Sequence, residues 1–207
     1  SDADITVCYA SDEEQAVSLC VEKVRSLLQA GVSDEDILVL APTRTKKVGT
    51  EKLNYALRQL YKVEDPIPGT RFCVGDRVIA NRNDYSESVN SRLPSRLRAM
   101  RPEDRENVYN GYRGQITRYE NGIVYIRYFL PNKEFPYLQE ELEYYIEPAY
   151  AMTVHKAQGG QAKHVVLVLM TALKERALIY TALTRCMEGG TVTVIADPGF
   201  ANAPYAA

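Results

Sequence analysis

Two uninterrupted apolar runs constrain the fold of this 207-residue chain more than any other feature. They are "ILVL" at residues 37–40 and "VVLVL" at residues 165–169. A strand without polar alternation is buried on both faces, which is typical of central strands in a parallel sheet. Further strand patterns at 4–10 and 191–197 and helix patterns at 11–31, 49–60 and 172–189 surround them. This alternation predicts an α/β fold with an open parallel sheet.

The middle of the chain has a different pattern. Hydrophobic and polar residues alternate over residues 71–85, 111–129 and 142–148, and tyrosines concentrate between 109 and 150. Asn121-Gly122 is a strong hairpin signal. We therefore predict three segments: a first part of the α/β domain (1–70), an inserted small antiparallel β-barrel (71–147) and the second part of the α/β domain (148–207).

Composition excludes several classes of protein. No run approaches 18 apolar residues, so we expect no membrane partner. The net charge is −2 and the pI is near 5.8, so a nucleic-acid site has to be a local patch. The four cysteines are spread without a CxxC pair, which argues against zinc and favours a reducing, cytoplasmic compartment. The chain has no G-x-x-x-x-G-K-[ST] phosphate loop.

The stretch "AYAMTVHKAQGGQ" at residues 149–161 concentrates hydrogen-bonding side chains just before an apolar strand. Thr153, His155, Lys156 and Gln158 supply a hydroxyl, an imidazole, an ammonium and an amide. Gly159-Gly160 lets backbone N–H groups approach a phosphate closely. The alternative interpretation is a solvated loop that joins the barrel to the next strand.

The stretch "ALIYTALTR" at residues 177–185 is the second candidate. On a helix, Leu178, Thr181 and Arg185 share one face, and Tyr180 lies to the side. In the alternative interpretation this is an amphipathic helix whose Arg185 complements the dipole at its C-terminus.

Together, "TVHKAQG", an apolar strand and "YTALTR" resemble motifs V and VI in the C-terminal RecA-like domain of superfamily 1 DNA helicases. The likeness is closest to the RecD-like and Pif1-like branch, of the exodeoxyribonuclease V alpha-subunit type. Residues 36–59 resemble the motif IV region, and "FCVGDRVIANRNDY…NGYRG" resembles the SH3-like barrel inserted in that domain. The resemblance implies a RecA-like parallel sheet flanked by helices, with the barrel as an insert.

The resemblance also implies roles for individual residues. Arg185 matches the catalytic arginine finger that reaches the γ-phosphate of ATP. The nucleotide-binding positions are Lys156, Gln158, Gly159 and Gln161, and the nucleic-acid-binding positions are Arg44, Thr153, His155, Tyr85 and Tyr112. We expect Arg185 and the loop at 153–159 to meet at one edge of the sheet. Where the family has Gly-Ser-Glu, this chain has Gly159-Gly160-Gln161. This difference fits either an altered contact with the ribose of the nucleotide or a degenerate helicase copy that does not turn over ATP.

The implied cofactors of the full-length motor are ATP and Mg²⁺. We expect this chain alone to bind neither and to supply no metal ligands. The implied partners are single-stranded DNA and a missing N-terminal RecA-like domain that carries the phosphate loop. The chain alone is expected to be inactive. Two alternatives stay open: a non-catalytic nucleic-acid or protein-binding module derived from a helicase, and part of an RNA helicase. Two interpretations of the insert also stay open. In one, its tyrosines stack on bases and Arg92, Arg96, Arg98 and Arg101 contact phosphates. In the other, the tyrosines are half-buried strand residues and the arginines belong to a solvated loop.

Overall fold

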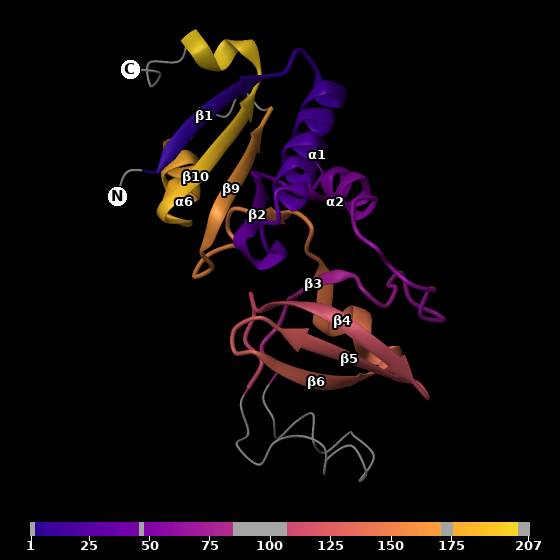
Figure 1. Cartoon of the computed structure of the whole chain (residues 1–207). Coiled ribbons are helices and arrows are strands. Elements are labelled where there is room, and N and C mark those ends of the chain that lie inside the picture. The colour runs from indigo at the N-terminus through magenta and orange to yellow at the C-terminus, as the bar shows by residue number, and fades with distance from the viewer. Residues whose placement is uncertain (1–2, 46–47, 85–106, 171–175, 203–207) are drawn as a thin grey trace. The chain divides into compact units, whose positions relative to one another are not determined.

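The computed structural model describes residues 3–45, 48–84, 107–170 and 176–202 (Figure 1). The chain divides into two compact units, residues 1–60 with 150–207, and residues 61–149. Across the described residues, no helix combines the length and the hydropathy needed to cross a membrane.

The first unit is built on a five-stranded parallel sheet. Its strands are β1 (Asp4–Tyr9), β2 (Ile37–Ala41), β8 (Met152–Thr153), β9 (Ala162–Leu169) and β10 (Cys186–Ala196). They lie in the order β1-β10-β9-β2-β8, and every neighbouring pair is parallel. Figure 1 shows the first four of these side by side. The two apolar runs form β2 and β9, which pair side by side within the sheet. This confirms the predicted α/β class with a parallel sheet.

Helices cover this sheet. They are α1 (Glu13–Gln29), α2 (Thr50–Arg58) and α6 (Arg176–Leu183), with short 3₁₀ helices η1 (Asp34–Asp36) and η3 (Pro198–Asn202). Both α1 and α6 contact β9 and β10. Residues 165–169 of β9 are all buried although their side chains alternate between the two faces. Both faces of the sheet are therefore covered at its centre, which explains the absence of polar alternation in β9.

The helix predicted over residues 172–189 ends earlier in the structure. Within the described residues α6 stops at Leu183, and β10 begins at Cys186, which pairs with Ala162. The predicted stop signal, Gly189-Gly190, instead lies where the register of β10 shifts, and Gly189 has a φ of 70°. The two glycines accommodate an irregularity within a strand and do not cap a helix.

The second unit contains a five-stranded antiparallel sheet. Its strands are β3 (Arg77–Ala80), β4 (Arg113–Glu120), β5 (Ile123–Tyr128), β6 (Lys133–Leu138) and β7 (Ile146–Pro148). Their order is β6-β5-β4-β3-β7. Asn121 and Gly122 have positive φ angles of 51° and 79° and join β4 to β5, so the predicted hairpin is confirmed.

The predicted closed barrel is not observed among the described residues. β6 and β7 lie at opposite ends of the strand order and do not pair with each other, so the sheet is open. The strand predicted over 142–148 is also wrong in its first half: η2 (Gln139–Glu141) and α5 (Leu142–Tyr145) precede the short strand β7. Leu142 and Tyr145 are buried three residues apart, a helical spacing, while the two residues between them are exposed.

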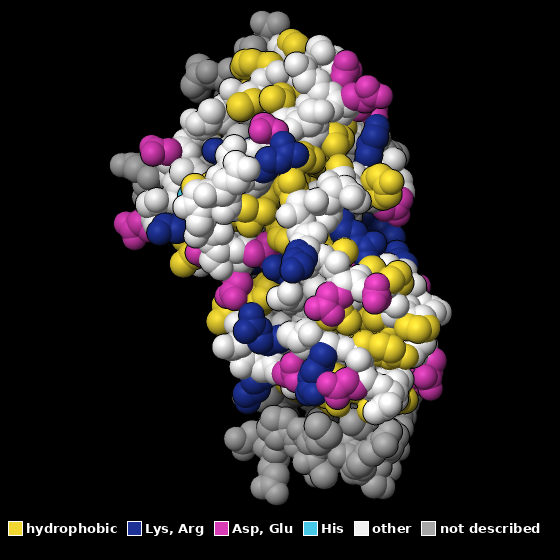
Figure 2. Space-filling view, turned by 45° about the vertical axis from the view of Figure 1, so that its right-hand side comes forward, with side chains coloured by type: hydrophobic (Ala, Val, Ile, Leu, Met, Phe, Trp, Pro, Cys, Tyr) yellow, Lys and Arg dark blue, Asp and Glu magenta, His cyan; other side chains and the backbone are white. Residues whose placement is uncertain are grey.

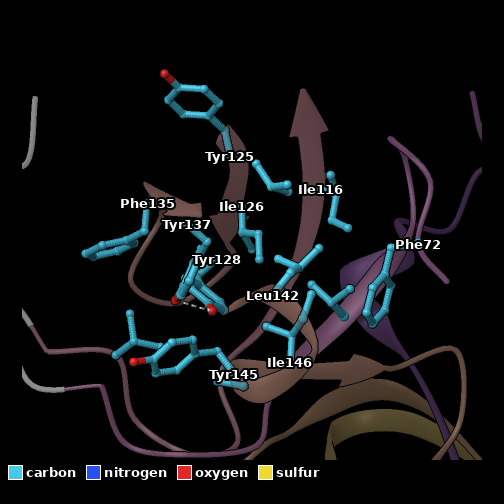
Figure 3. Close-up of a cluster of buried hydrophobic side chains, with 14 of the residues drawn as sticks. Phe72, Ile116, Tyr125, Ile126, Tyr128, Phe135, Tyr137, Leu142, Tyr145 and Ile146 are labelled. Atoms are coloured by element: carbon cyan, nitrogen blue, oxygen red, sulfur yellow. Dashed lines mark hydrogen bonds between the residues drawn. The ribbon is translucent and has the colours of Figure 1, made fainter. Parts of the chain in front are cut away.

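Aromatic side chains form much of the core of the second unit (Figure 3). Tyr128 and Tyr137 are 0% and 2% exposed, and their hydroxyl oxygens lie 2.8 Å apart in a hydrogen bond. Tyr128 also packs against Phe135, with ring centroids 5.8 Å apart. A buried hydroxyl without a partner is costly, so these two tyrosines satisfy each other across neighbouring strands.

This pair predicts a non-additive effect on stability. Tyr128→Phe or Tyr137→Phe should each lower the free energy of unfolding by about 1–3 kcal/mol, because the remaining hydroxyl loses this partner. The double variant should cost clearly less than the sum of the two single changes. Urea unfolding followed by circular dichroism measures this, with the exposed Tyr55→Phe as control. Strictly additive losses would show that the two hydroxyls are not coupled.

Candidate functional site

The polar loop after β8 runs between two sides of the parallel sheet: the carboxyl edge, where the strands end, and the amino edge, where they begin. Thr153 is paired with Ala41, the last residue of β2, so it lies at the carboxyl edge. Ile37, the first residue of β2, is paired with His164, and β9 starts two residues earlier, at Ala162. The start of β9 therefore lies at the amino edge. Residues 154–161 therefore run from one edge to the other and cross β2, which lies between β8 and β9.

The first part of this loop is a helical turn. The backbone N–H of Ala157 donates to the Thr153 carbonyl at 3.1 Å, and that of Gly160 donates to the Ala157 carbonyl at 3.0 Å. Val154 and Ala157 are buried, whereas His155 and Gln158 are exposed. This spacing gives the turn a buried and a solvent-exposed face. Gly159 adopts a φ of 87°, the conformation that ends such turns at low cost only for glycine.

Thr153 holds the start of the turn. Its Oγ1 accepts a hydrogen bond from the backbone N–H of Lys156 at 3.3 Å, as a capping hydroxyl does. Both side chains are half-buried, and Gln161, at the other end of the loop, is exposed. The predicted residues of this segment therefore lie along one path from the carboxyl to the amino edge. The expectation that Arg185 and the loop at 153–159 meet at one edge is met only in part, because Thr153 lies at the carboxyl edge and the contact with Arg185 is made by Gly160, just beyond that loop.

Arg185 lies between α6 and β10 at the amino edge. Its carbonyl accepts from the backbone N–H of Ala162 at 2.9 Å. Its Nη1 lies 3.5 Å from the Gly160 carbonyl oxygen, and its Nη2 donates to Thr184 Oγ1 at 3.4 Å. Within the described residues its buried Nε has no hydrogen-bond partner. The guanidinium is thus half-buried and only weakly bonded, which leaves it able to bind an anion.

The irregularity in β10 lies directly after Arg185. Between Cys186 and Thr191 the strand gains extra residues relative to β9. A Cβ on Gly190 would lie 2.1 Å from the Lys163 carbonyl oxygen and 2.8 Å from Cys186 Sγ. Only glycine fits so close to a neighbouring backbone, so Gly190 allows β10 to rejoin β9 after the irregularity. Sequence reasoning interpreted this glycine as a helix stop and missed this role.

Arg44 lies at the carboxyl edge, in the loop that follows β2. Its exposed side chain forms an ion pair with Glu51, with Nη2 and Oε1 3.4 Å apart. The loop is closed by backbone bonds from Thr50 to Thr43 (3.0 Å) and from Glu51 to Arg44 (3.2 Å). A Cβ on Gly49 would lie 2.0 Å from the Arg44 carbonyl oxygen, so this turn requires glycine. The pattern alone did not single out Gly49.

Tyr112, predicted to stack on bases, takes part in the aromatic packing of the second unit. It is partly buried against the core of the second unit and packs edge-to-face on Tyr109 and Tyr128, with centroid distances of 5.6 and 6.0 Å. Tyr109 is the more exposed of the three. Tyr85 and the arginines at 92, 96, 98 and 101 lie outside the described residues.

Basic and acidic side chains are interspersed on the visible face of the second unit (Figure 2). Arg118 illustrates this: it lies 2.9 Å from Glu134 and 3.3 Å from Glu120 and stacks 3.6 Å above the Tyr125 ring. Partly neutralised cations of this kind attract phosphates only weakly. This mixed face differs from the continuous basic stripe of a protein that coats DNA.

The imidazole of His164, near the start of β9, adds little charge to the amino edge. Burial lowers the pKa of His164 below its ordinary value, and the Lys23 ammonium acts in the same direction. The His164 ring accordingly stays neutral near pH 7, with Nδ1 2.8 Å from Thr191 Oγ1. Among the described residues no cluster of His, Cys, Asp and Glu side chains could hold a metal ion.

Sequence comparison places the polar loop and Arg185 in a known family segment. Residues 148–189 match the family model of the UvrD-like helicase C-terminal domain. The ATP-dependent RecD2 DNA helicase of Deinococcus radiodurans is 28% identical over 73% of this chain and 19% of its own length. The RecBCD enzyme subunit RecD of Haemophilus influenzae is 44% identical over 25% of this chain and 8% of its own. The chain thus spans less than a fifth of these relatives.

Structural comparison supports the same fold. The Bacteroides Pif1 helicase in complex with ADP-AlF3 and ssDNA aligns with a TM-score of 0.50 at 14% identity, covering 84% of this chain and 48% of that one. The chain matches about half of that molecule, and the likeness concerns the fold alone.

The geometry around Arg185 predicts that Gly190 is important for stability. Gly190→Ala should lower the free energy of unfolding by about 1–3 kcal/mol, because the Cβ has to displace backbone and not a flexible side chain. Gly160→Ala is the matched control: its nearest contact would be 3.4 Å and its φ is not positive, so its cost should stay within about 0.5 kcal/mol. Chemical denaturation measures both. Equal losses would show that the close approach at Gly190 is easily relieved.

Proposed function

We propose that this chain, whose helicase C-terminal-like segment relates it to the RecD-type superfamily 1 DNA helicases, forms the second, RecA-like motor domain of such an enzyme. In this proposal it supplies an arginine finger to an ATP site that an N-terminal motor domain completes, and its opposite edge binds single-stranded DNA. The insert at 71–147 is proposed to act as the SH3-like element of this domain.

One observation carries the proposal: Arg185 and the end of the polar loop meet at the amino edge of the sheet. Arg185 Nη1 is 3.5 Å from the Gly160 carbonyl oxygen, and its Nε has no partner among the described residues. A half-buried guanidinium with spare donors suits a phosphoryl group, because it can bind two oxygens at once and stays charged. In phosphoryl transfer such a group stabilises charge on the oxygens of the transferred phosphate.

The proposed nucleotide contacts lie at or lead to the same amino edge. Gln161 directly precedes β9, next to the residues that contact Arg185, and its amide can bond a ribose hydroxyl. Lys156, Gln158 and Gly159 lie on the turn that leads to this point. The residues present therefore fit an anionic nucleotide. ATP with Mg²⁺ would be held mainly by the phosphate loop and acidic residue of the partner domain, because this chain has no phosphate loop.

The DNA contacts are proposed for the carboxyl edge. Arg44 follows the end of β2, Thr153 is the last residue of β8 and is paired with that end, and His155 is exposed on the turn. The ion pair between Arg44 and Glu51 is exposed on both sides, so it holds the arginine weakly and can be exchanged for a backbone phosphate. Tyr85 and the partly buried Tyr112 stay proposed contacts of the insert.

The first test is ATP turnover. The chain alone should hydrolyse no ATP, and in the complete motor Arg185→Ala should lower the ATPase rate about a thousandfold or more while largely sparing DNA affinity. Arg185→Lys should not restore turnover, because an ammonium lacks the planar fork. Arg25→Ala, which removes an exposed arginine of α1 paired with Glu22, is the control and should leave the rate unchanged. Normal ATP turnover by the Arg185→Ala variant would show that Arg185 is not an arginine finger.

The second test is binding of oligothymidine by this chain at several salt concentrations. Arg44→Ala should weaken binding and make the slope of log K against log salt shallower by about 0.7, one phosphate contact on a single strand. Arg118→Ala, whose cation is already paired with two glutamates, should change neither value. An RNA oligomer of the same length separates the two substrates. Tighter binding of RNA would favour an RNA helicase, and an unchanged slope would remove Arg44 from the interface.

A further inference from the structure

One side chain of α2, that of Asn54, bonds to the segment that leads into β8. Asn54 Nδ2 donates to the carbonyl oxygen of Ala151 at 3.0 Å, and its Oδ1 accepts from the backbone N–H of the same residue at 2.8 Å. Ala151 is 2% exposed, so both of its backbone groups depend on protein partners. The Asn54 amide thus pairs with Ala151 as a neighbouring strand would, across 97 residues of sequence.

Only an amide side chain can make both of these bonds. A carboxylate accepts but does not donate, so Asp would repel the Ala151 carbonyl, and an aliphatic side chain would leave both backbone groups unpaired. An unpaired buried backbone group costs about 1–3 kcal/mol. The pairing therefore selects for asparagine on geometry and donor pattern together.

The segment held in this way is packed, but its backbone pairing with the sheet is short. β8 has only two residues, lies at the edge of the sheet, and pairs on one side with Leu40 and Ala41 of β2. Ala151 directly precedes it, and Thr153, at its end, caps the turn that leads to Gly160. An edge strand this short is not stable by itself, so the two bonds from Asn54 add to the anchoring that its buried side chains supply.

Asn54 also links this segment to the Arg44 loop. The first turn of α2 is bonded to that loop through Thr50 and Glu51, whose backbone N–H groups donate to the carbonyls of Thr43 and Arg44. Asn54 lies one turn further along the same helix. Arg44 and Thr153, at the carboxyl edge, are therefore attached to one rigid element, α2.

We propose that Asn54 is a positioning residue that fixes Thr153 and the following turn relative to Arg44, so that both reach the same stretch of nucleic-acid backbone. This inference rests on the proposed function, because it assigns Asn54 to the single-stranded DNA contact at that edge. Asn54 touches no nucleic acid itself and acts through the backbone of Ala151.

The test uses the 207-residue chain with Asn54→Ala, Asn54→Asp, Thr153→Val and the Asn54→Ala/Thr153→Val double variant. Gln59→Ala, an exposed change at the end of the same helix, is the matched control. Fluorescence anisotropy measures affinity for a labelled oligothymidine, and NMR measures amide exchange at Ala151 and Val154. Asn54→Ala should weaken binding about tenfold and speed exchange at both amides. Asn54→Asp should behave similarly, and Gln59→Ala should match the unmodified chain.

The double variant separates positioning from simple stabilisation. If Asn54 acts through Thr153, the double variant should bind about as weakly as the weaker single variant, because the two changes disable the same contact. Losses that add in full, or Asn54 variants that bind normally while folded, would overturn the proposal.

The failure of the proposed function gives a different result. An unmodified chain that binds no oligothymidine would contradict the DNA-binding role itself, and the DNA contact assigned to Asn54 would fail with it. Amide exchange would still test whether the Asn54 hydrogen bonds hold the segment at Ala151. Unchanged exchange at Ala151 and Val154 in Asn54→Ala would show that they do not.

Discussion

The parallel pairing of β9 with β10 is the constraint on which the candidate nucleotide site depends. Ala162 and Cys186 are register partners, and the Ala162 N–H donates to the Arg185 carbonyl at 2.9 Å. The residues that precede these partners, Gln161 and Arg185, must therefore arrive at the same edge of the sheet. A slip of one register position would separate them by about 3.3 Å along the strand. The irregularity after Cys186, which Gly190 permits, absorbs the difference in length between the two strands without moving this pair.

The loop between β8 and β9 gives the two edges a physical connection. Thr153, directly before the loop, is paired with β2 and lies two residues after Ala151, which Asn54 holds, and Gly160 near the end of the loop contacts Arg185. The turn between them buries Val154 and Ala157, so it is packed and cannot slide freely. In the proposed motor, a displacement at the DNA edge would reach the nucleotide edge through a single packed turn. Contiguous, tightly packed elements of this kind are suited to carry such coupling.

The sequence was sufficient for the features that depend on local pattern. The apolar runs predicted β2 and β9, and Asn121-Gly122 predicted the hairpin, because burial on two faces and a type I′ turn leave direct marks on composition. It did not predict β6: Pro136 interrupts the pattern and is tolerated there because β6 lies at a sheet edge. It also did not show that Tyr112 packs edge-to-face on Tyr128, since alternation shows that a side chain points to one face but not whether that face is packed. Asn54 and Gly190 were missed because their partners are distant in sequence.

Both connections to the second unit are anchored to neighbouring parts of the first. The chain leaves after α2 and returns at Tyr150, and the Asn54 amide joins that helix to Ala151. Each unit has its own sheet, and the insert has its own aromatic core. An insertion whose two ends are pinned side by side does not alter the register of its host. The length and composition of the intervening segment can therefore change without straining the strand pairing of the unit that carries it.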